Sequence, residues 1–152
     1  LAGAMPPLLG WTAVTGHITG FPLLLVLIIF AWTPPHFWAL AIHRRDDYAK
    51  ANVPMMPVTH GIEFTRIQVW LYSWLLLAVS LLPLALGVVG GIYALAAIVL
   101  GVRFLQWSYR LLRGKRVDAA WGTFKFSISY LLYLFLALLI LLLLAPLICL
   151  NT

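Results

Sequence analysis

Three long stretches of this sequence contain no charged side chain, and they constrain the fold more than any other feature. They cover residues 21–42, 67–102 and 126–152. About 20 predominantly apolar residues are enough for a helix to cross a bilayer, so the first and third stretches each predict one membrane-spanning helix. The second stretch is long enough for most of two helices, and a cluster of glycines at 87–91 supplies a turn between them. The sequence therefore predicts an all-α integral membrane protein with four full crossings.

The chain is too apolar for a soluble domain of 152 residues, since 64% of its residues are hydrophobic and 9% are charged. We expect one domain with helices at about 21–45, 67–88, 92–113 and 124–149. Residues 1–15 are apolar but short, and Pro6 and Pro7 are expected to kink them. Because no methionine or charged leader precedes them, we expect these residues to be the end of a fifth helix whose beginning is absent.

Basic residues are concentrated in and beside two expected connections, at about 46–66 and 114–123. Of the ten lysines and arginines, only Arg103 lies elsewhere. The positive-inside rule therefore places both connections in the cytoplasm. The net charge of +6 follows from this topology and suits a lipid bilayer with anionic headgroups. It gives no reason to propose nucleic acid as a partner.

The segment WTPPHFWALAIHRRDDYAK, from Trp32 to Lys50, ends an apolar helix in a cluster of opposite charges. Asp46 and Asp47 beside Arg44 could bind a metal ion and an anion together. The alternative is an ordinary helix end, in which arginines mark the cytoplasmic side and aspartates neutralise them. A helix salt bridge from Asp46 to Lys50 would then explain both residues. The residues alone favour this ordinary helix end.

Helical phasing relates the charges to a histidine at membrane depth. If the helix re-forms after Thr33 and the two following prolines, five positions share one face. They are His36, Leu40, His43, Asp47 and Lys50. Asp46 lies off this face, so geometry ranks Asp47 above it. His36 could contact substrate or transfer a proton, or its ring N–H could satisfy a carbonyl that the prolines leave without a donor.

A second polar face is predicted on the helix at about 92–113. Arg103, Gln106, Arg110 and Arg113 follow one another there at spacings that place them on one side. Arg103 is about ten residues from the charged end, roughly 15 Å, which is deeper than an arginine comfortably snorkels. It should face protein, water or a bound anion, and either substrate binding or a tie between helices would explain it.

Two consecutive runs, WTPPHFWALAI and RRDDYAKANVPMMPVTHGIEFTR, resemble the second half of the protohaem IX farnesyltransferases (haem O synthases), a family in the UbiA superfamily of intramembrane prenyltransferases. GAMPPLLGWTAVTG and FKFSISYLLYLF extend the resemblance over nearly the whole chain. It implies a nine-helix bundle in a bacterial inner membrane, of which this chain holds the end of the fifth helix and the sixth to ninth. The missing N-terminal half would carry the first aspartate-rich motif, so we expect this chain alone to be inactive.

The resemblance also implies a reaction: Mg²⁺-dependent transfer of the farnesyl group of farnesyl diphosphate to a vinyl group of haem B, through a carbocation. Asp47, with Asp46 beside it, would bind the metal, and Asp47 and His36 would be catalytic. The diphosphate would contact Arg44, Tyr48, Lys50 and Arg103. The haem or the farnesyl channel would be lined by His36, Trp32 and Phe37, although aromatic residues in membrane helices also serve as packing or interface anchors. His36 could additionally ligate the haem iron.

Two other functions remain open at this stage. A UbiA relative that prenylates an aromatic quinone precursor would share the fold and the diphosphate loop, but is not expected to carry the PPHFW segment. A fragment of a multi-pass transporter is the other alternative. Transporters usually bind their substrates near the bilayer midplane, between two internal sequence repeats. In this chain most polar residues gather at one end of the helices, and no internal repeat is visible.

Overall fold

The computed structural model of the chain describes residues 2–114 and 118–149, except for the side chains at 142 and 144–149. Its elements are a short 3-10 helix, η1 (Ala2–Ala4), and the helices α1 (Pro6–Thr15), α2 (Gly20–His43), α3 (Arg45–Lys50), α4 (Met56–Thr59), α5 (Ile62–Ala85), α6 (Gly91–Arg113) and α7 (Asp118–Cys149). Four stretches are long and apolar enough to cross a membrane: α2, α5, α6 and the Asp118–Leu141 part of α7. The predicted all-α fold with four crossings is confirmed.

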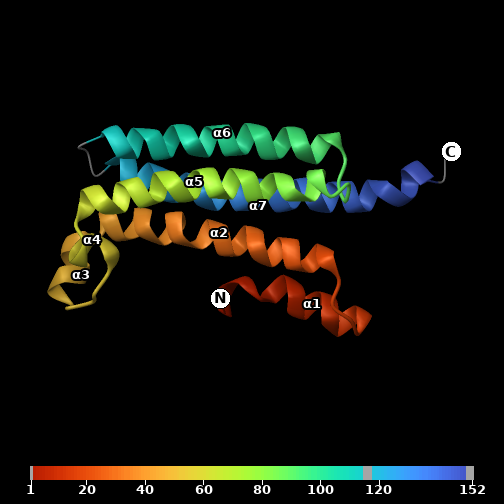
Figure 1. Cartoon of the computed structure of the whole chain (residues 1–152), viewed down its shortest axis with the longest axis horizontal. Coiled ribbons are helices and arrows are strands. Elements are labelled where there is room, and N and C mark those ends of the chain that lie inside the picture. The colour runs from red at the N-terminus through yellow and green to blue at the C-terminus, as the bar shows by residue number, and fades with distance from the viewer. Residues whose placement is uncertain (1, 115–117, 150–152) are drawn as a thin grey trace.

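The four long helices form an antiparallel bundle (Figure 1). α5 packs against α2 and α6, and α7 packs against α6 and α2, so the four helices close into a ring. Large side chains fill its centre, including Tyr93, Phe104 and Tyr130. Ser73 and Ser108 meet between α5 and α6, with a 2.6 Å hydrogen bond between their Oγ atoms. Such pairs satisfy polar groups that hydrocarbon cannot solvate.

α1 packs against α2, on the side of the bundle away from α6 (Figure 1). Pro6 and Pro7 lie in the first turn of this helix. A proline there removes an N–H that has no helical partner, so the pair begins α1 and does not kink it. The expectation of a kink at these residues is wrong.

α2 runs without interruption from Gly20 to His43 through Pro34 and Pro35, in keeping with the helix expected at about 21–45, so the considered re-start of the helix after Thr33 is wrong. Thr33 does not cap a new helix; its hydroxyl donates to the carbonyl of Ile29 at 2.7 Å. Neighbouring helices can hold a proline-containing membrane helix together where its own hydrogen bonds are lost. α2 has such neighbours, since Pro35 is buried and α5 and α7 flank the helix.

The connections between helices are shorter than the sequence predicts. α5 begins at Ile62, directly after Gly61, whose φ of 86° is a left-handed conformation that favours glycine. The expected connection at about 46–66 therefore contains α3, α4 and the first turn of α5. α7 is already helical at Asp118, inside the connection expected at 114–123, and residues 115–117 lie outside the described ranges.

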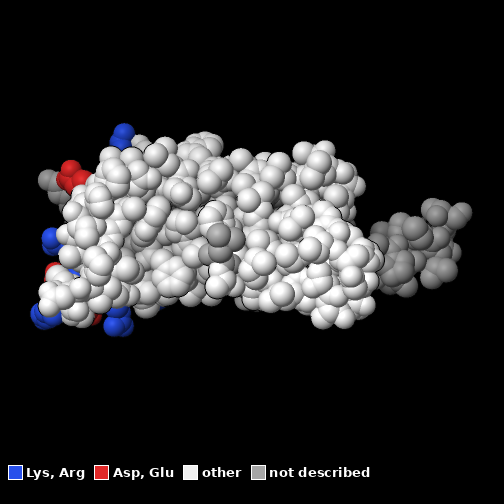
Figure 2. Space-filling model, turned by 60° about the horizontal axis from the view of Figure 1, so that its bottom comes forward, with Lys and Arg blue, Asp and Glu red and all other residues white. Residues whose placement is uncertain are grey.

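Charged side chains gather at one end of the bundle on the face that Figure 2 shows, and the rest of that face is uncharged. The link from α2 to α5, which contains α3 and α4, lies at this end together with the end of α6 and the start of α7 (Figure 1). Both basic connections thus lie at the same end, as expected for one side of a membrane. We call it the charged end.

Candidate active site at the charged end

The link between α2 and α5 is folded into two short helices. α3 packs against α4, and α4 packs against α5. The side chain of Arg45 joins the two short helices, because its Nε donates to the carbonyl of Pro57 at 3.3 Å. A backbone hydrogen bond of 3.0 Å from Val53 N to Tyr48 O closes the turn between them, where Asn52 has a φ of 52°. The predicted diphosphate residues are therefore carried on a defined structure.

Both predicted metal-binding carboxylates lie on α3 and are exposed. Asp47 pairs with Arg44 at 3.8 Å between Oδ2 and Nη1, and the two side chains are 67% and 59% exposed. Asp46 lies in a different environment. It borders a hollow of about 210 Å³ whose other lining residues are Ile42, His43, Arg45 and Ile62. The ion pair is thus Arg44 with Asp47, and the salt bridge considered between Asp46 and Lys50 is not among those of the described residues.

The single helical face that was expected to join His36 to Asp47 is not present. α2 ends at His43, Arg44 leaves the helical conformation with φ −104° and ψ 28°, and α3 starts anew at Arg45. Asp47 therefore does not continue the face of α2 that carries His36. The geometric reason for ranking Asp47 above Asp46 is wrong, and only the family resemblance still supports that ranking.

His36 is held by α7. Its Nδ1 lies 2.7 Å from Ser127 Oγ, and its ring stacks on Trp32 at 4.2 Å and lies 4.7 Å from the ring of Phe124. Trp32 is anchored to the same residue, since its Nε1 donates to the backbone carbonyl of Ser127 at 2.8 Å. His36 thus bonds a neighbouring helix and not a carbonyl of its own helix that the prolines leave without a donor.

The hydrogen bonds of Ser127 assign the proton on this imidazole. Ser127 Oγ lies 2.6 Å from the carbonyl oxygen of Phe124, which can only accept, so the single hydroxyl proton is donated there. Ser127 Oγ must then accept from His36, which places the imidazole proton on Nδ1. Nε2 keeps its lone pair, and no hydrogen bond of the described chain engages it. His36 is therefore arranged as a proton acceptor at Nε2.

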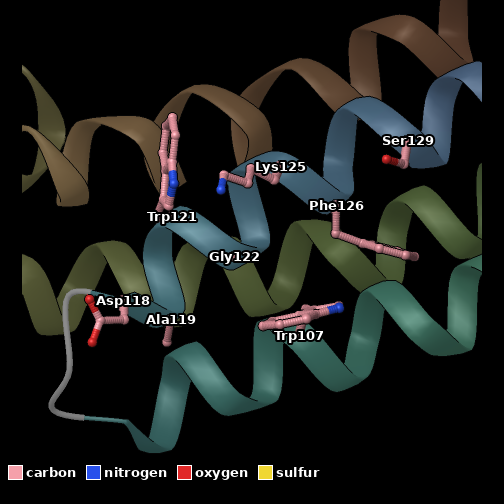
Figure 3. A pocket seen from close by; sticks show the side chains of 8 residues that line it. All are labelled: Trp107, Asp118, Ala119, Trp121, Gly122, Lys125, Phe126 and Ser129. Atoms are coloured by element: carbon pink, nitrogen blue, oxygen red, sulfur yellow. The ribbon is translucent and has the colours of Figure 1, made fainter.

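Aromatic rings continue from His36 to the charged end along the seam between α2 and α7. Phe124 stacks on Trp121 at 5.3 Å, and Trp121 stacks on His43 at 4.9 Å. Figure 3 shows Trp121 extending from α7 toward α2. We call this set the aromatic ladder; its members are Trp32, His36, Phe124, Trp121 and His43, and all five are half-buried. Because His43 also lines the hollow beside Asp46, the ladder connects His36 to the carboxylates across two helices.

The remaining predicted site residues divide into two groups. Phe37 meets the ring of His36 edge-on at 5.3 Å and is 49% exposed, so it flanks the ladder on its outer side. Tyr48 and Lys50 lie on α3 with the two aspartates. Arg103 is separate, because it is exposed on α6, which packs on α5 and α7, and its described hydrogen bond is to Gln106. The structure does not bring Arg103 to the other predicted diphosphate residues.

Three residues of the candidate site were not predicted: Trp121, Phe124 and Ser127. They belong to α7, whose place beside α2 is a tertiary contact. A signal was nevertheless present, since the three positions are spaced by three residues near the beginning of an apolar stretch and so share one helix face.

A ring of four apolar helices, with carboxylates and histidines at one end, defines a helical integral membrane protein with a polar site at the membrane surface. The family model described as "UbiA prenyltransferase family" matches residues 1–139. The chain therefore belongs to the UbiA prenyltransferase family, and the resemblance drawn from the PPHFW and RRDDY segments is confirmed. Membership in a family of prenyltransferases favours an enzyme over a transporter.

Individual relatives are similar over most of the chain. It is 64% identical over 140 residues to a Pseudomonas putida (strain GB-1) protein named "Protoheme IX farnesyltransferase 1", and 64% identical over 140 residues to a Marinobacter nauticus protein named "Protoheme IX farnesyltransferase". These matches cover 92% of the chain but only 47% and 46% of the relatives. The chain thus spans about half the length of the curated relatives it matches. No solved structure matches it.

The carboxylates of this chain fit a divalent metal ion in part. The described residues contain no group of three histidine, cysteine or acidic side chains able to enclose a metal. Mg²⁺ is usually bound through one or two carboxylates together with water and phosphate oxygens, and not by a complete protein cage. The adjacent, exposed Asp46 and Asp47 suit a metal that binds together with a phosphorylated substrate.

Proposed function

We propose that the full-length protein transfers the farnesyl group of farnesyl diphosphate to a vinyl group of haem B, giving haem O, and that this chain supplies one half of the active site. The observation that carries the proposal is the 64% identity with proteins named for this reaction. The arrangement of the site supports it, because exposed charges for a diphosphate lie next to an aromatic seam for an apolar chain.

The exposed charges would hold the diphosphate. Mg²⁺, when bound, neutralises charge on the leaving group, with Asp47 as ligand or as an anchor through water and Asp46 beside it. Arg44 is exposed and paired only with Asp47 among the described residues, so it can turn to a phosphate oxygen. Lys50 and Tyr48 on the same short helix would add donors. Stabilising the negative charge on the leaving group in this way promotes cleavage of the bond from farnesyl C1 to oxygen.

The aromatic ladder would receive the farnesyl cation. Its rings present negatively polarised faces to a cation and exclude water that would otherwise capture it. The vinyl group of haem B attacks C1, and a water molecule then adds to the new cation and loses a proton. His36 Nε2 would accept that proton, and His36, Trp32 and Phe37 would lie on the haem side.

The second half of the site would come from the remainder of the protein, and we place the charged end in the cytoplasm of a bacterial cell, with the bundle in the inner membrane. Basic residues cluster at that end, in agreement with the positive-inside rule. A first aspartate-rich motif on the missing N-terminal half would complete the metal site opposite Asp46 and Asp47.

The test is reconstitution of the full-length protein with farnesyl diphosphate and haem B, with the product identified by mass. We expect haem O with Mg²⁺, none with EDTA, and none from this chain alone. Transfer to 4-hydroxybenzoate in place of haem B would instead assign the protein to the quinone-precursor enzymes of the family. Turnover by this chain alone would contradict the division of the site between two halves.

A further inference from the structure

The outer seam between α6 and α7 contains an open groove that the proposed reaction does not use. It consists of two hollows of about 630 and 480 Å³ that share Phe126. Figure 3 shows Phe126 and Trp107 on facing helices along this seam. Gly122 lets the ring of Trp107 pack directly on α7 beside the groove, because a Cβ there would lie 2.6 Å from Cζ3 of Trp107. The deeper hollow is lined mainly by aliphatic side chains of α6, at Ile98, Val99, Leu100 and Val102.

Two cations border the groove at different depths. Lys125 lies toward the charged end, with its Nζ 5.0 Å above the ring of Trp121. Arg103 lies deeper, and its Nη1 donates to Gln106 Oε1 at 3.2 Å, so the guanidinium extends one turn along α6 toward the charged end. Neither forms an ion pair within the described part of the chain. Asp118 is the acidic residue among the lining side chains, so the groove has an excess of positive charge.

An arginine at membrane depth requires an anion or water, and the apolar floor beyond it requires an apolar partner. One molecule that supplies both is an anionic phospholipid. We propose that the α6–α7 groove binds an anionic phospholipid, with its phosphate between Lys125 and Arg103 and an acyl chain along Phe126 toward Val99. Trp107 and Trp121 lie at the level of the headgroup, where membrane proteins commonly place tryptophan.

Charge complementarity selects this occupant over another part of the same protein. α1 lies against α2, on the opposite side of the bundle from α6 (Figure 1), so it does not occupy this groove. The groove borders the aromatic ladder at Trp121, but its other lining residues belong to α6 and α7 and none belongs to α2. The proposal therefore does not depend on the reaction proposed above.

The test measures which lipids the full-length protein retains after extraction from nanodiscs that contain phosphatidylglycerol and phosphatidylcholine with identical acyl chains. Native mass spectrometry of the wild type should show preferential retention of phosphatidylglycerol. The double variant Arg103→Gln with Lys125→Gln should lose this preference by about 30-fold, since each basic residue near an anionic surface contributes about a factor of five. The matched control is Arg113→Gln, which removes an exposed cation of α6 outside the groove and should retain the preference.

Four results would overturn the proposal. The first is equal retention of the two lipids by the wild type, and the second is an unchanged preference in a correctly folded double variant, with folding checked by thermal melting. Release of the lipid by millimolar inorganic phosphate would indicate a site for free phosphate. As an independent measurement, the thiol of the Lys125→Cys variant should react with a lipid-soluble maleimide; if it is protected in the full-length protein, another part of that protein covers the groove and the proposal fails.

Discussion

Two regions of the candidate site differ in how firmly the structure holds them. Along the seam of α2 and α7, His36 and His43 contact the rings of Phe124 and Trp121 on the facing helix, and both Trp32 and His36 hydrogen-bond to Ser127. In the link between α2 and α5, Asp46, Asp47 and Arg44 are exposed, and the weak ion pair at 3.8 Å is their described interaction. Exposed ion pairs of this kind contribute between about 0 and 1 kcal/mol.

This difference has a functional meaning under the proposed reaction. A surface that binds the farnesyl cation is more effective if it is formed before the substrate binds, because reorganisation during the reaction would raise the activation barrier. Charges that bind a diphosphate and a metal can be ordered by those ligands when they arrive. Substitutions in the link should therefore affect activity without affecting stability, whereas substitutions in the seam should affect both.

The largest effect is expected from Asp47→Asn in the full-length protein. Farnesyl transfer should fall at least about a hundred-fold, because the amide cannot supply the charge that a divalent cation requires. Its melting temperature should not change, since the side chain is 67% exposed. The matched control is Glu63→Gln, an exposed acid in the first turn of α5, which should keep its activity. Normal transfer by Asp47→Asn would remove Asp47 from the site.

Trp121→Leu should lower transfer by about ten-fold, through loss of a ring that faces the cation. Trp121→Phe should recover most of the activity, because it keeps an aromatic face in the ladder. Trp74→Leu serves as the control, since Trp74 is an exposed tryptophan on α5 outside the ladder. Steady-state rates with farnesyl diphosphate measure the effect; equal losses for Trp121→Leu and Trp74→Leu would show that the ladder has no specific role.

Ser127→Ala should lower kcat by about five-fold and change KM little, because His36 would no longer be confined to the form that leaves Nε2 unprotonated. Ser127→Thr keeps the hydroxyl group and should restore the rate. The ¹⁵N shifts of His36, assigned with a His36→Asn variant, should show more protonation of Nε2 in Ser127→Ala. An unchanged tautomer would refute the role of Ser127, whereas a changed tautomer with an unchanged rate would refute only the catalytic role of His36.

The smallest effect on activity is expected at the seam of α5 and α6, which carries no candidate site residue. Ser73→Ala and Ser108→Ala each remove one partner of a buried hydrogen bond, and each should destabilise the bundle by about 1 kcal/mol. The double variant should lose less than the sum, because the two single variants remove the same hydrogen bond between the helices. Thermal melting in detergent measures the coupling. Transfer rates should not change, and a loss of activity at constant stability would contradict a purely structural role.

The helix bundle could be predicted because few kinds of secondary structure can span a bilayer. Charge-free stretches of sufficient length must be helices, and the glycines near 87 divide the long stretch where the chain turns; Gly87 has a φ of 67°. A helix at about 21–45 was predicted in this way, but not that it passes Pro34 and Pro35 without a break. Local rules end a helix at such a pair, and it is the neighbouring helices that hold this one together.

The candidate site could be predicted only where it is local in sequence. His36, Asp46 and Asp47 were identified because they lie in one segment, but the path between them was assigned to one helix. A non-helical residue at position 44 separates α2 from α3, and the rings that join His36 to the charged end come partly from α7. Only the pairing of α2 with α7 brings those rings together, and no pattern within either segment specifies that pairing.

The central claim is that the charged end and the aromatic ladder form one substrate site, and photocrosslinking tests it most directly. The full-length protein would be irradiated with a farnesyl diphosphate analogue that carries a photoreactive group on its isoprenoid chain, with and without Mg²⁺. We predict Mg²⁺-dependent labelling of the α7 peptide that contains Trp121 and Phe124, and loss of that labelling in Asp47→Asn. Labelling confined to α5 and α6, or labelling of α7 that persists without Mg²⁺ and in Asp47→Asn, would contradict the claim.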